Sequence, residues 1–284
     1  MKFVTFTHND REHFGALKDD KIVDLTDAFG SLRETLAADR FEEAKTAAQG
    51  QAATIALADV VLRPVVTDAE KYFCIGVNYA NRNAEYKDGS EAPKWPSVFM
   101  RSRESFVGHN EFILRPPESD KLDYEGEIVL VVGKEGRRIA EEDALDHIAG
   151  MTLMNEGTLR DWVRHAKFNV TQGKNFEKTG SIGPYMVTMD EIDDVTNMDI
   201  QTRVNGELRQ DDNTSNMMFP IRFIVAYLSR FARLRPGDII ATGTPNGAGA
   251  RFEPPKYLIP GDVVEITSPA LGTLRNEVKD EFPA

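Results

Sequence analysis

The segment DYEGEIVLVVG, residues 123–133, places acidic side chains directly before an unbroken apolar run. Residues 128–132 are β-branched except for Leu130 and show no polar alternation, which predicts a strand buried on both faces. Glu125 and Glu127 are two residues apart, so on a strand they point to the same side, and Asp123 has the same parity. A chain that buries this strand must therefore hold negative charges at the mouth of its core.

The first 68 residues predict a small α+β N-terminal domain. KFVTFT and KIVDLTDAF, residues 2–7 and 21–29, have the composition of short strands around a polar turn. Residues 31–49 are rich in Ala, Glu, Leu and Lys and end at Gly50, which predicts one helix. The domain boundary is expected between residues 68 and 69.

Residues 69–284 predict a mostly β catalytic domain with a few helices. Asn205-Gly206 favours the tight turn of a hairpin. The turns RPGD and IPGD, residues 235–238 and 259–262, each open a β-branched strand, which favours a β-roll or barrel. GMTLMNEG, residues 150–157, predicts a further strand. Helices are expected within residues 141–150, from residue 158 onward, and over residues 220–234, where the apolar stripe is clearest.

The net charge and the lack of long apolar stretches in the sequence exclude several classes of binding partner. The formal net charge of −12 opposes binding to nucleic acid or to an anionic membrane. No apolar stretch approaches the roughly 20 residues of a membrane span, and the first residues lack the apolar centre of a signal peptide. We therefore expect a cytoplasmic protein that binds a small molecule. The single cysteine, Cys74, is interpreted as a core residue.

Glu125, Glu127 and Glu156 form a candidate metal site, because each lies where a predicted strand begins or ends. Three carboxylates make an all-oxygen site that suits Mg²⁺ or Mn²⁺, and sometimes Ca²⁺. Zinc fits less well, since no His pair or Cys cluster has ligand spacing. Taken alone, two glutamates before a strand are more often a solvated strand end.

Two other segments point to a bound 2-oxo acid. GKNF, residues 173–176, places Lys174 beside a glycine and close to an aromatic residue. ATGTPNGAG, residues 241–249, is a loop of small residues whose backbone N–H groups and hydroxyls suit a carboxylate. Metal, lysine and loop together suit a substrate with an oxo group next to a carboxylate.

Seven segments in family order resemble the fumarylacetoacetate hydrolase superfamily: GVNYANRNAE, PSVFMRS, LDYEGEIVLVVG, GMTLMNEGTLRD, GKNFEKTGSIGP, VNGELRQDDNTSNM and LRPGDIIATGTPNGAG. The resemblance implies a β-roll catalytic domain, a homodimer and one divalent cation per site. It makes Glu125, Glu127 and Glu156 the metal ligands and Lys174 the active-site lysine. Substrate-binding residues implied by position are Tyr79, Arg160, Gln210, Gly243 and Thr244, the last contacting the substrate carboxylate.

The sequence departs from the family pattern at two positions. The third ligand is usually Asp, whereas Glu156 has an arm one methylene longer. The lid motif GVNYANRNAE carries Arg82 where a water-activating His is usual, and it keeps Glu85. A guanidinium stays protonated and cannot act as a base near neutral pH, although it can clamp a second carboxylate. Glu85 is therefore the candidate base, in a predicted lid over residues 78–97.

The function predicted first is divalent-metal-dependent hydrolysis of a C–C bond in a 2,4-dioxo acid of the acylpyruvate or fumarylpyruvate kind, through a metal-stabilised enolate. The alternative is an isomerase, tautomerase, hydratase or decarboxylase acting on a 2-oxo or 2-hydroxy-dienoate dicarboxylic acid at the same metal site. The missing histidine favours this alternative, because a double-bond shift or a tautomerisation needs proton transfer but no activated water. A non-catalytic dicarboxylate-binding protein is a third hypothesis.

Overall fold

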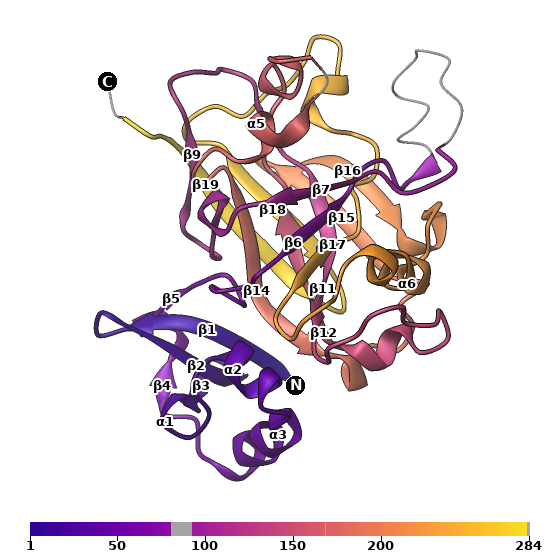
Figure 1. Ribbon diagram of the computed structural model, residues 1–284. Helices are drawn as coiled ribbons and strands as arrows, with labels where there is room; N and C mark the ends of the chain where they lie inside the picture. The colour runs from indigo at the N-terminus through magenta and orange to yellow at the C-terminus, as the bar shows by residue number, and fades with distance from the viewer. Residues whose placement is uncertain (81–92, 168, 283–284) are drawn as a thin grey trace.

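The computed structural model describes residues 1–80, 93–167 and 169–282. Its strands form a 12-stranded sheet, a five-stranded sheet and a two-stranded sheet, with short helices around them (Figure 1). The fold is mostly β with α, as predicted. None of the three sheets closes into a barrel within the described residues, so the arrangement is a roll of open sheets. No helix in this part of the chain is long and apolar enough to span a membrane.

The first 62 residues form a hairpin-based unit with three helices. Its strands are β1 (Lys2–His8), β2 (Arg11–Lys18), β3 (Lys21–Asp24), β4 (Ile55–Ala56) and β5 (Val61–Leu62). Its helices are α1 (Thr26–Phe29), α2 (Leu32–Ala37) and α3 (Phe41–Gly50). The prediction of one helix over residues 31–49 was wrong, because the chain breaks between α2 and α3, where Asp39 has a φ of 56°. Strand β2 was not predicted, and the segment at 21–29 is a strand only as far as Asp24 before it enters α1.

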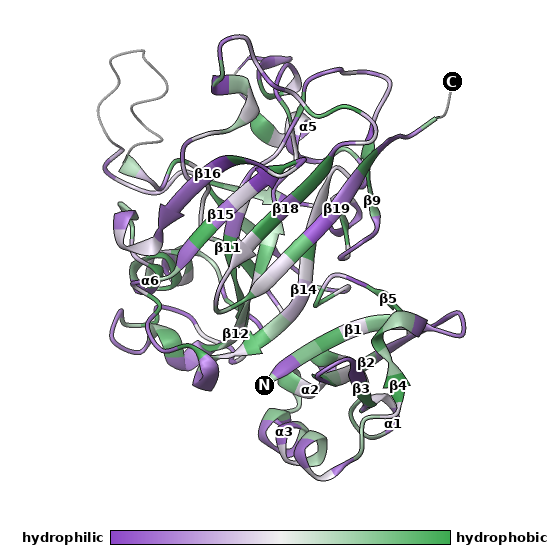
Figure 2. Ribbon diagram, turned by 180° about the vertical axis from the view of Figure 1, so that it is seen from behind, coloured by the Kyte–Doolittle hydropathy of each residue, from purple (hydrophilic) through white to green (hydrophobic). Residues whose placement is uncertain are grey.

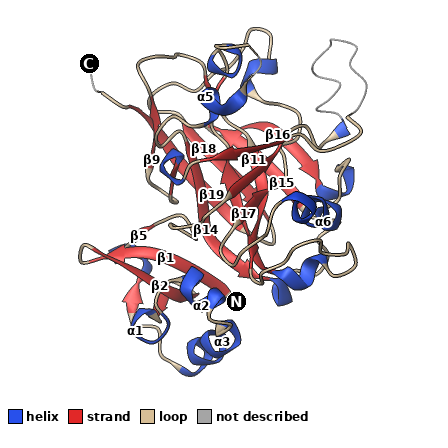
Figure 3. Ribbon diagram, in the orientation of Figure 1, coloured by secondary structure: helices blue, strands red, loops and turns tan. Residues whose placement is uncertain are grey.

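The large sheet continues from this unit into the rest of the protein. Strand β1 pairs antiparallel with β14 (Gly180–Thr188), with Lys2 opposite Val187 and Phe3 opposite Met186. The order along the sheet is β4-β3-β2-β1-β14, followed by β12 (Ile148–Asn155), β11 (Gly126–Val132), β17 (Ile239–Ala241), β6 (Tyr72–Ile75) and β7 (Val98–Arg101). Figure 3 shows the strands in red. The two parts of the chain therefore share backbone hydrogen bonds, and the domain boundary after residue 68 stays a prediction.

Strand β11 (Gly126–Val132) lies inside the sheet between β12 (Ile148–Asn155) and β17 (Ile239–Ala241). Every residue of β11 is buried, which confirms the strand predicted from its apolar run. Beyond β17 follow β6 (Tyr72–Ile75) and the edge strand β7 (Val98–Arg101). The short strand β8 (Phe106–Val107) pairs with β14.

The five-stranded sheet packs against the large sheet across one shared core, in which Ile128 and Leu153 lie with Ile266 and Leu274. Its strands, in spatial order, are β16 (Glu207–Asn213), β15 (Asp199–Val204), β18 (Val263–Ser268), β19 (Gly272–Asp280) and β9 (Phe112–Arg115). Figure 2 shows a mixture of hydrophobic and hydrophilic residues along β15 and β19, whereas β16 is mostly hydrophilic. Strands β15 and β16 form the predicted hairpin, with φ of 52° at Asn205 and 80° at Gly206.

Two helices flank the strands of the roll. Helix α6 (Ile221–Phe231) lies within the predicted residues 220–234 and buries Ile224, Val225 and Leu228. Helix α5 (Val170–Lys174) is a single turn. The helix predicted from residue 158 was wrong: the chain forms β13 (Thr158–Leu159), which pairs with β10 (Leu122–Asp123), and then a 3-10 turn at Trp162–Arg164. Within residues 141–150 the helical part is a 3-10 turn, Ala144–His147.

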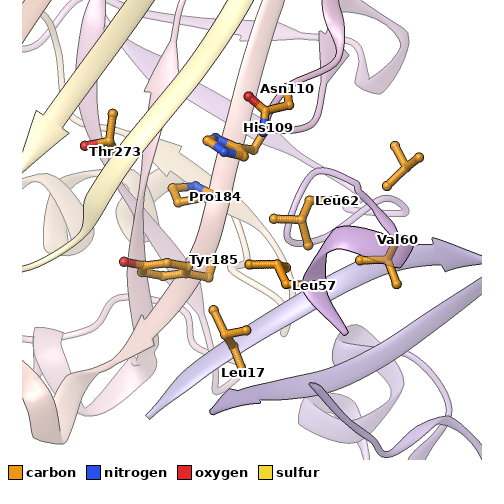
Figure 4. Close-up of a pocket in the computed structure, with 10 residues that line it drawn as sticks. Leu17, Leu57, Val60, Leu62, His109, Asn110, Pro184, Tyr185 and Thr273 are labelled. Carbon is orange, nitrogen blue, oxygen red and sulfur yellow. The ribbon is translucent and has the colours of Figure 1, made fainter. Parts of the chain in front are cut away.

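A cavity of about 350 Å³ lies where the N-terminal unit meets the roll (Figure 4). Leu17, Leu57 and Leu62 form its apolar side, and His109 and Tyr185 face them from the roll. The backbone N–H of Arg275 donates a hydrogen bond to Nδ1 of His109, so this nitrogen carries no proton. Burial, followed by the nearby Arg275 charge, lowers the pKa of His109 to about 4. The junction is therefore apolar and holds a neutral histidine.

Candidate functional site

Strand pairing brings the three candidate metal ligands together. In the antiparallel register of β11 and β12, Gly126 is opposite Asn155. Glu125 and Glu156 therefore meet just beyond this pair, where the N–H of Glu156 donates a 2.7 Å hydrogen bond to the carbonyl oxygen of Glu125. Glu127 points to the same side of the strand as Glu125, as the parity of the sequence predicts. Taking one carboxylate oxygen from each residue, the three atoms lie within 4.8 Å of one another.

The carboxylate cluster, meaning Glu125, Glu127 and Glu156, is almost fully buried, with 4%, 1% and 1% of each residue exposed. Burial raises the pKa of Glu127 well above its usual range, and the charges of Glu156 and Glu125 add to that effect. Oε1 of Glu156 is buried without a hydrogen-bond partner. Like charges at this spacing and an unpartnered oxygen fit a hard divalent cation, for which an all-oxygen donor set is suitable. The residues present therefore fit the implied metal.

Lys174 lies at the end of α5 with its ammonium group against the cluster. Its Nζ donates a 2.8 Å hydrogen bond to Oε2 of Glu156 and a second, very short one to Oε2 of Glu125. Burial lowers the pKa of Lys174, but the charges of Glu125 and Glu156 outweigh it, so the pKa is raised. The preceding Gly173 permits this approach, since a Cβ there would lie 2.7 Å from the carbonyl oxygen of Leu159.

Arg160 and Asp123 support the cluster from one side. Arg160 donates from Nη2 to Glu125 at 2.8 Å and from Nε to Asp123 at 2.6 Å. Asp123 also accepts the backbone N–H groups of Gly249 and Ala250. It lies on β10, a separate short strand, so its parity with Glu125 in the sequence does not bring it into the cluster. The hydrogen bonds of Asp123 therefore connect the end of the 241–249 loop to Arg160.

The loop at residues 241–249 lies against Glu127. The N–H of Gly243, where φ is 101°, donates a 2.8 Å hydrogen bond to Oε2 of Glu127. The Thr244 hydroxyl donates to the carbonyl oxygen of Gly126 at 3.0 Å and accepts a bond from Nε2 of Gln210 at 2.9 Å. Oε1 of Gln210 in turn accepts the N–H of Gly126. The sequence-predicted residues Gln210, Gly243 and Thr244 therefore lie together beside the metal cluster, and their binding of a substrate carboxylate stays a prediction.

Tyr79 is fully buried, and its hydroxyl has no hydrogen-bond partner. Burial is the main cause that raises its pKa, and the charges of Asp212 and Glu127 add to it. The hydroxyl therefore lies within electrostatic reach of the cluster. Arg82 and Glu85, the predicted clamp and base, lie outside the described residues, as does most of the predicted lid at 78–97.

Sequence analysis missed two polar residues that hold Glu125. Oδ1 of Asn155 accepts the Glu125 N–H at 3.0 Å, and the Thr158 hydroxyl donates to Oε2 of Glu125 at 3.3 Å. Both are buried. Their position on either side of Glu156 in the chain is the signal that was available, because polar residues at buried strand ends hydrogen-bond to nearby groups. A buried arginine, Arg101, was also missed.

None of the five histidines of the chain hydrogen-bonds to the cluster in the described structure. His165 stacks on Trp162, with 4.0 Å between ring centroids, as a packing residue does. The remaining histidines lie on the N-terminal unit, at the junction cavity and beside Lys134.

Comparison with known proteins gives family and fold matches over nearly the whole chain. Residues 71–279 match the family model described as fumarylacetoacetate (FAA) hydrolase C-terminal, and residues 1–62 match the model described as Rv2993c-like, N-terminal. The chain is 38% identical over 302 residues to the oxaloacetate tautomerase YisK of Bacillus subtilis (strain 168), which covers 98% of this chain and 100% of that protein.

Two solved structures illustrate the similarity of fold. The fumarylacetoacetate hydrolase EaFAH from psychrophilic Exiguobacterium antarcticum gives a TM-score of 0.82 at 32% identity, over 99% of this chain and 100% of that one. The maleylpyruvate hydrolase from Sphingobium sp. SYK-6, in complex with a manganese(II) ion and pyruvate, gives 0.82 at 25% identity, over 99% of each chain.

Proposed function

The chain belongs to the fumarylacetoacetate hydrolase family, and we propose that it is a divalent-metal-dependent tautomerase that interconverts the keto and enol forms of a small 2-oxo dicarboxylic acid such as oxaloacetate. From the sequence, C–C hydrolysis is the function predicted first, and tautomerisation is among the alternatives. The full-length similarity to an oxaloacetate tautomerase supports the alternative.

The observation that carries the proposal is the position of Lys174. Its ammonium group has three N–H donors, and two of them are used by Glu125 and Glu156. Among the described residues the third donor has no hydrogen-bond acceptor, and we propose that it binds an oxygen atom of a substrate beside the cluster. Tautomerisation needs proton transfer at C3 and at the 2-oxo oxygen but no activated water, whereas hydrolysis also needs a base that activates water.

Glu125, Glu127 and Glu156 would hold the cation, for which we propose Mg²⁺ or Mn²⁺. When bound, the dication supplies Lewis-acid polarisation of the 2-oxo group and offsets negative charge on its oxygen. Thr244 and Gln210 are proposed to position the loop that receives the carboxylate next to that oxo group, because their hydrogen bonds fix this loop against Gly126. Tyr79 offers a buried hydroxyl that has no hydrogen-bond partner among the described residues.

The proton balance of the reaction closes within the substrate. In the keto-to-enol direction one proton leaves C3 and one proton is delivered to the 2-oxo oxygen, with no net uptake. We assign delivery and recovery of the oxygen-bound proton to Lys174, because a dication held by Glu125 and Glu156 would offset the charges that raise the pKa of this lysine. Glu85 remains the sequence-based candidate for the C3 proton, and Arg82 the candidate clamp for the second carboxylate.

The test is the rate at which the enol form of oxaloacetate is consumed, followed by its ultraviolet absorbance, with metal-free protein and after addition of Mg²⁺ or Mn²⁺. We expect acceleration only with metal and its loss on chelation. Exchange of the C3 hydrogens of oxaloacetate and pyruvate in D₂O, followed by NMR, is the second measurement. If no 2-oxo acid shows metal-dependent exchange, the protein is not a tautomerase, and the non-catalytic dicarboxylate-binding hypothesis is favoured.

Hydrolysis of a 2,4-dioxo acid is the second candidate, favoured by the similarity to a maleylpyruvate hydrolase with pyruvate bound. The assay is release of pyruvate from an acylpyruvate under the same metal conditions. Metal-dependent cleavage that is faster than oxaloacetate tautomerisation would reverse the order of the two candidates.

A further inference from the structure

Arg101, at the end of β7, is a nearly fully buried arginine with only 4% of its surface exposed. Its guanidinium donates to the carbonyl oxygen of Gly157 at 3.0 Å, to the Ser105 hydroxyl at 3.1 Å and to the Thr179 hydroxyl at 3.3 Å. It also lies 4.4 Å from the centroid of the Phe106 ring. These contacts with uncharged groups hold the guanidinium in one orientation beside Gly157, the residue that follows Glu156.

No carboxylate of the described residues forms an ion pair with Arg101, which is unusual for a buried arginine. Burial lowers its pKa, and the largest opposing cause is the charge of Glu156, followed by Cys74, Glu125 and Glu127. Because Gly157 follows Glu156 in the chain, the 3.0 Å bond to the Gly157 carbonyl oxygen places the Arg101 charge next to the cluster. Among the described residues, no hydrogen bond or ion pair joins Arg101 to a member of the cluster.

We propose that Arg101 is the fixed counter-charge of the carboxylate cluster. This rests on the metal site of the proposed function and adds a role for a residue that contacts neither metal nor substrate. The cluster and Asp123 bring four carboxylates together with two cations, Lys174 and Arg160. This group carries a net negative charge in a low-dielectric interior when its members are ionised, and Arg101 offsets part of it while the site holds no cation. The same charge repels a dication and attracts a dianionic substrate, so Arg101 sets the balance between the two.

The proposal predicts two affinity changes of opposite sign in Arg101→Gln, which removes the charge but keeps an N–H donor for Gly157. Mn²⁺ should bind the metal-free variant about tenfold more tightly, because a repulsive unit charge near the dication is gone. Oxalate, a dianionic 2-oxo acid analogue, should bind the Mn²⁺-saturated variant about tenfold more weakly. A general loosening of the site would weaken both.

The experiment is calorimetric titration of wild type, Arg101→Gln, Arg101→Lys and Thr179→Val, first with Mn²⁺ and then with oxalate. Arg101→Lys keeps the charge and should stay within about threefold of wild type in both affinities. Thr179→Val removes one hydroxyl that holds the guanidinium and leaves the charge, so it serves as the matched structural control. Its two affinities should also match those of wild type.

Tighter Mn²⁺ binding together with weaker oxalate binding in Arg101→Gln, and rescue by Arg101→Lys, supports the proposal. Unchanged or weaker Mn²⁺ binding in Arg101→Gln overturns it. If Arg101→Gln does not fold without metal, saturating Mn²⁺ should restore the folded state seen by circular dichroism, and failure to do so also overturns it. The two affinities test the counter-charge role of Arg101 whether or not the protein is a tautomerase. If wild type binds Mn²⁺ but shows no tautomerase activity, only the proposed function is contradicted.

Discussion

Lys174 donates a 2.8 Å hydrogen bond to Oε2 of Glu156, while Oε1 of the same carboxylate is buried without a partner. One oxygen of Glu156 is thus satisfied by a protein cation, and the other is left for a cation that the protein must acquire. Lys174 also reaches Glu125, so the ammonium group spans one edge of the carboxylate cluster. The proposed proton carrier and the proposed metal ligands are therefore a single hydrogen-bonded unit.

Two substitutions of Lys174 distinguish the contribution of its positive charge from the contribution of its proton transfer. Lys174→Met should lower the rate of oxaloacetate tautomerisation by about 10²- to 10⁴-fold, the usual contribution of a positioned acid or base. Lys174→Arg keeps a positive charge, but a guanidinium does not give up its proton near neutral pH, so it should be as impaired as the Met variant. The measurement is kcat under saturating Mn²⁺.

The control for these variants is Lys71→Met, which removes a lysine that pairs with buried Asp238 outside the carboxylate cluster. It should lower stability and leave kcat near that of wild type. If Lys174→Arg retains more than about a tenth of the wild-type rate, Lys174 acts through its charge alone and the proton-transfer role is wrong.

Removing one carboxylate from the cluster should raise the melting temperature of the metal-free protein and lower its affinity for the metal. In Glu127→Gln the amide oxygen can still accept the Gly243 N–H, but the repulsion from Glu125 and Glu156 is gone. The metal-free variant should therefore melt about 2–5 °C higher than wild type. Its affinity for Mn²⁺ should fall by about 100-fold or more, and the rise in melting temperature on adding Mn²⁺ should shrink accordingly.

Thermal melts with and without Mn²⁺ check this prediction, and Glu265→Gln in β18 is the control, since Glu265 lies outside the cluster. That variant should gain as much from Mn²⁺ as wild type does. A Glu127→Gln protein that is stabilised by Mn²⁺ to the same extent as wild type would show that Glu127 is not a ligand.

The parts of the site that could be predicted from the sequence depend on local periodicity. The apolar run after Glu127 determined the buried strand β11, and the two-residue spacing correctly placed Glu125 and Glu127 on one side. The turn at Asn205-Gly206 followed from its need for positive φ. In each case the physical cause lies within a few consecutive residues, so a pattern can report it.

The parts that could not be predicted depend on contacts between distant segments or on breaks that leave no pattern. Asp123 shares the parity of Glu125, but β10 ends before β11 begins, and Asp123 is held by Gly249 and Arg160 instead. The break at Asp39 has neither Gly nor Pro to mark it, and it occurs where an Asp adopts a positive φ, which Asp tolerates better than most residues. Pairing of β1 with β14 joins residues far apart in the chain.

Acid should destabilise the protein through His109 at the junction between the N-terminal unit and the roll. Its pKa is lowered from the ordinary 6.5 to about 4, so between these values the unfolded chain binds a proton that the folded protein does not. The contribution of neutral His109 to the free energy of unfolding is therefore fully present above pH 6.5 and is lost as the pH falls toward 4. Protonation also removes the acceptor at Nδ1 for the Arg275 N–H.

The measurement is urea unfolding at pH 7.5, 5.5 and 4.5 for wild type and His109→Asn, whose side-chain oxygen can replace Nδ1 as the acceptor. The variant should lose less stability over this range than wild type does. His147→Asn, at a histidine beside Lys134, is the control and should follow the wild-type curve. Identical pH dependence of wild type and His109→Asn would mean that His109 does not contribute.

Gly243 should be intolerant of a side chain for two separable reasons. Its φ of 101° is unfavourable for any L residue with a side chain, and a Cβ there would lie 2.7 Å from Cβ of Asn78. Gly261 has a similar φ of 90° but nothing within 4 Å of its Cβ position, so Gly261→Ala reports the backbone strain alone. We expect Gly261→Ala to cost about 1 kcal/mol and Gly243→Ala about 2–4 kcal/mol of unfolding free energy.

The same two variants should differ in activity. Because a shift of this loop also removes the N–H donor of Glu127, Gly243→Ala should lose Mn²⁺-dependent activity while Gly261→Ala retains it. Equal losses of stability and full activity in both variants would show that the loop adjusts without disturbing the cluster.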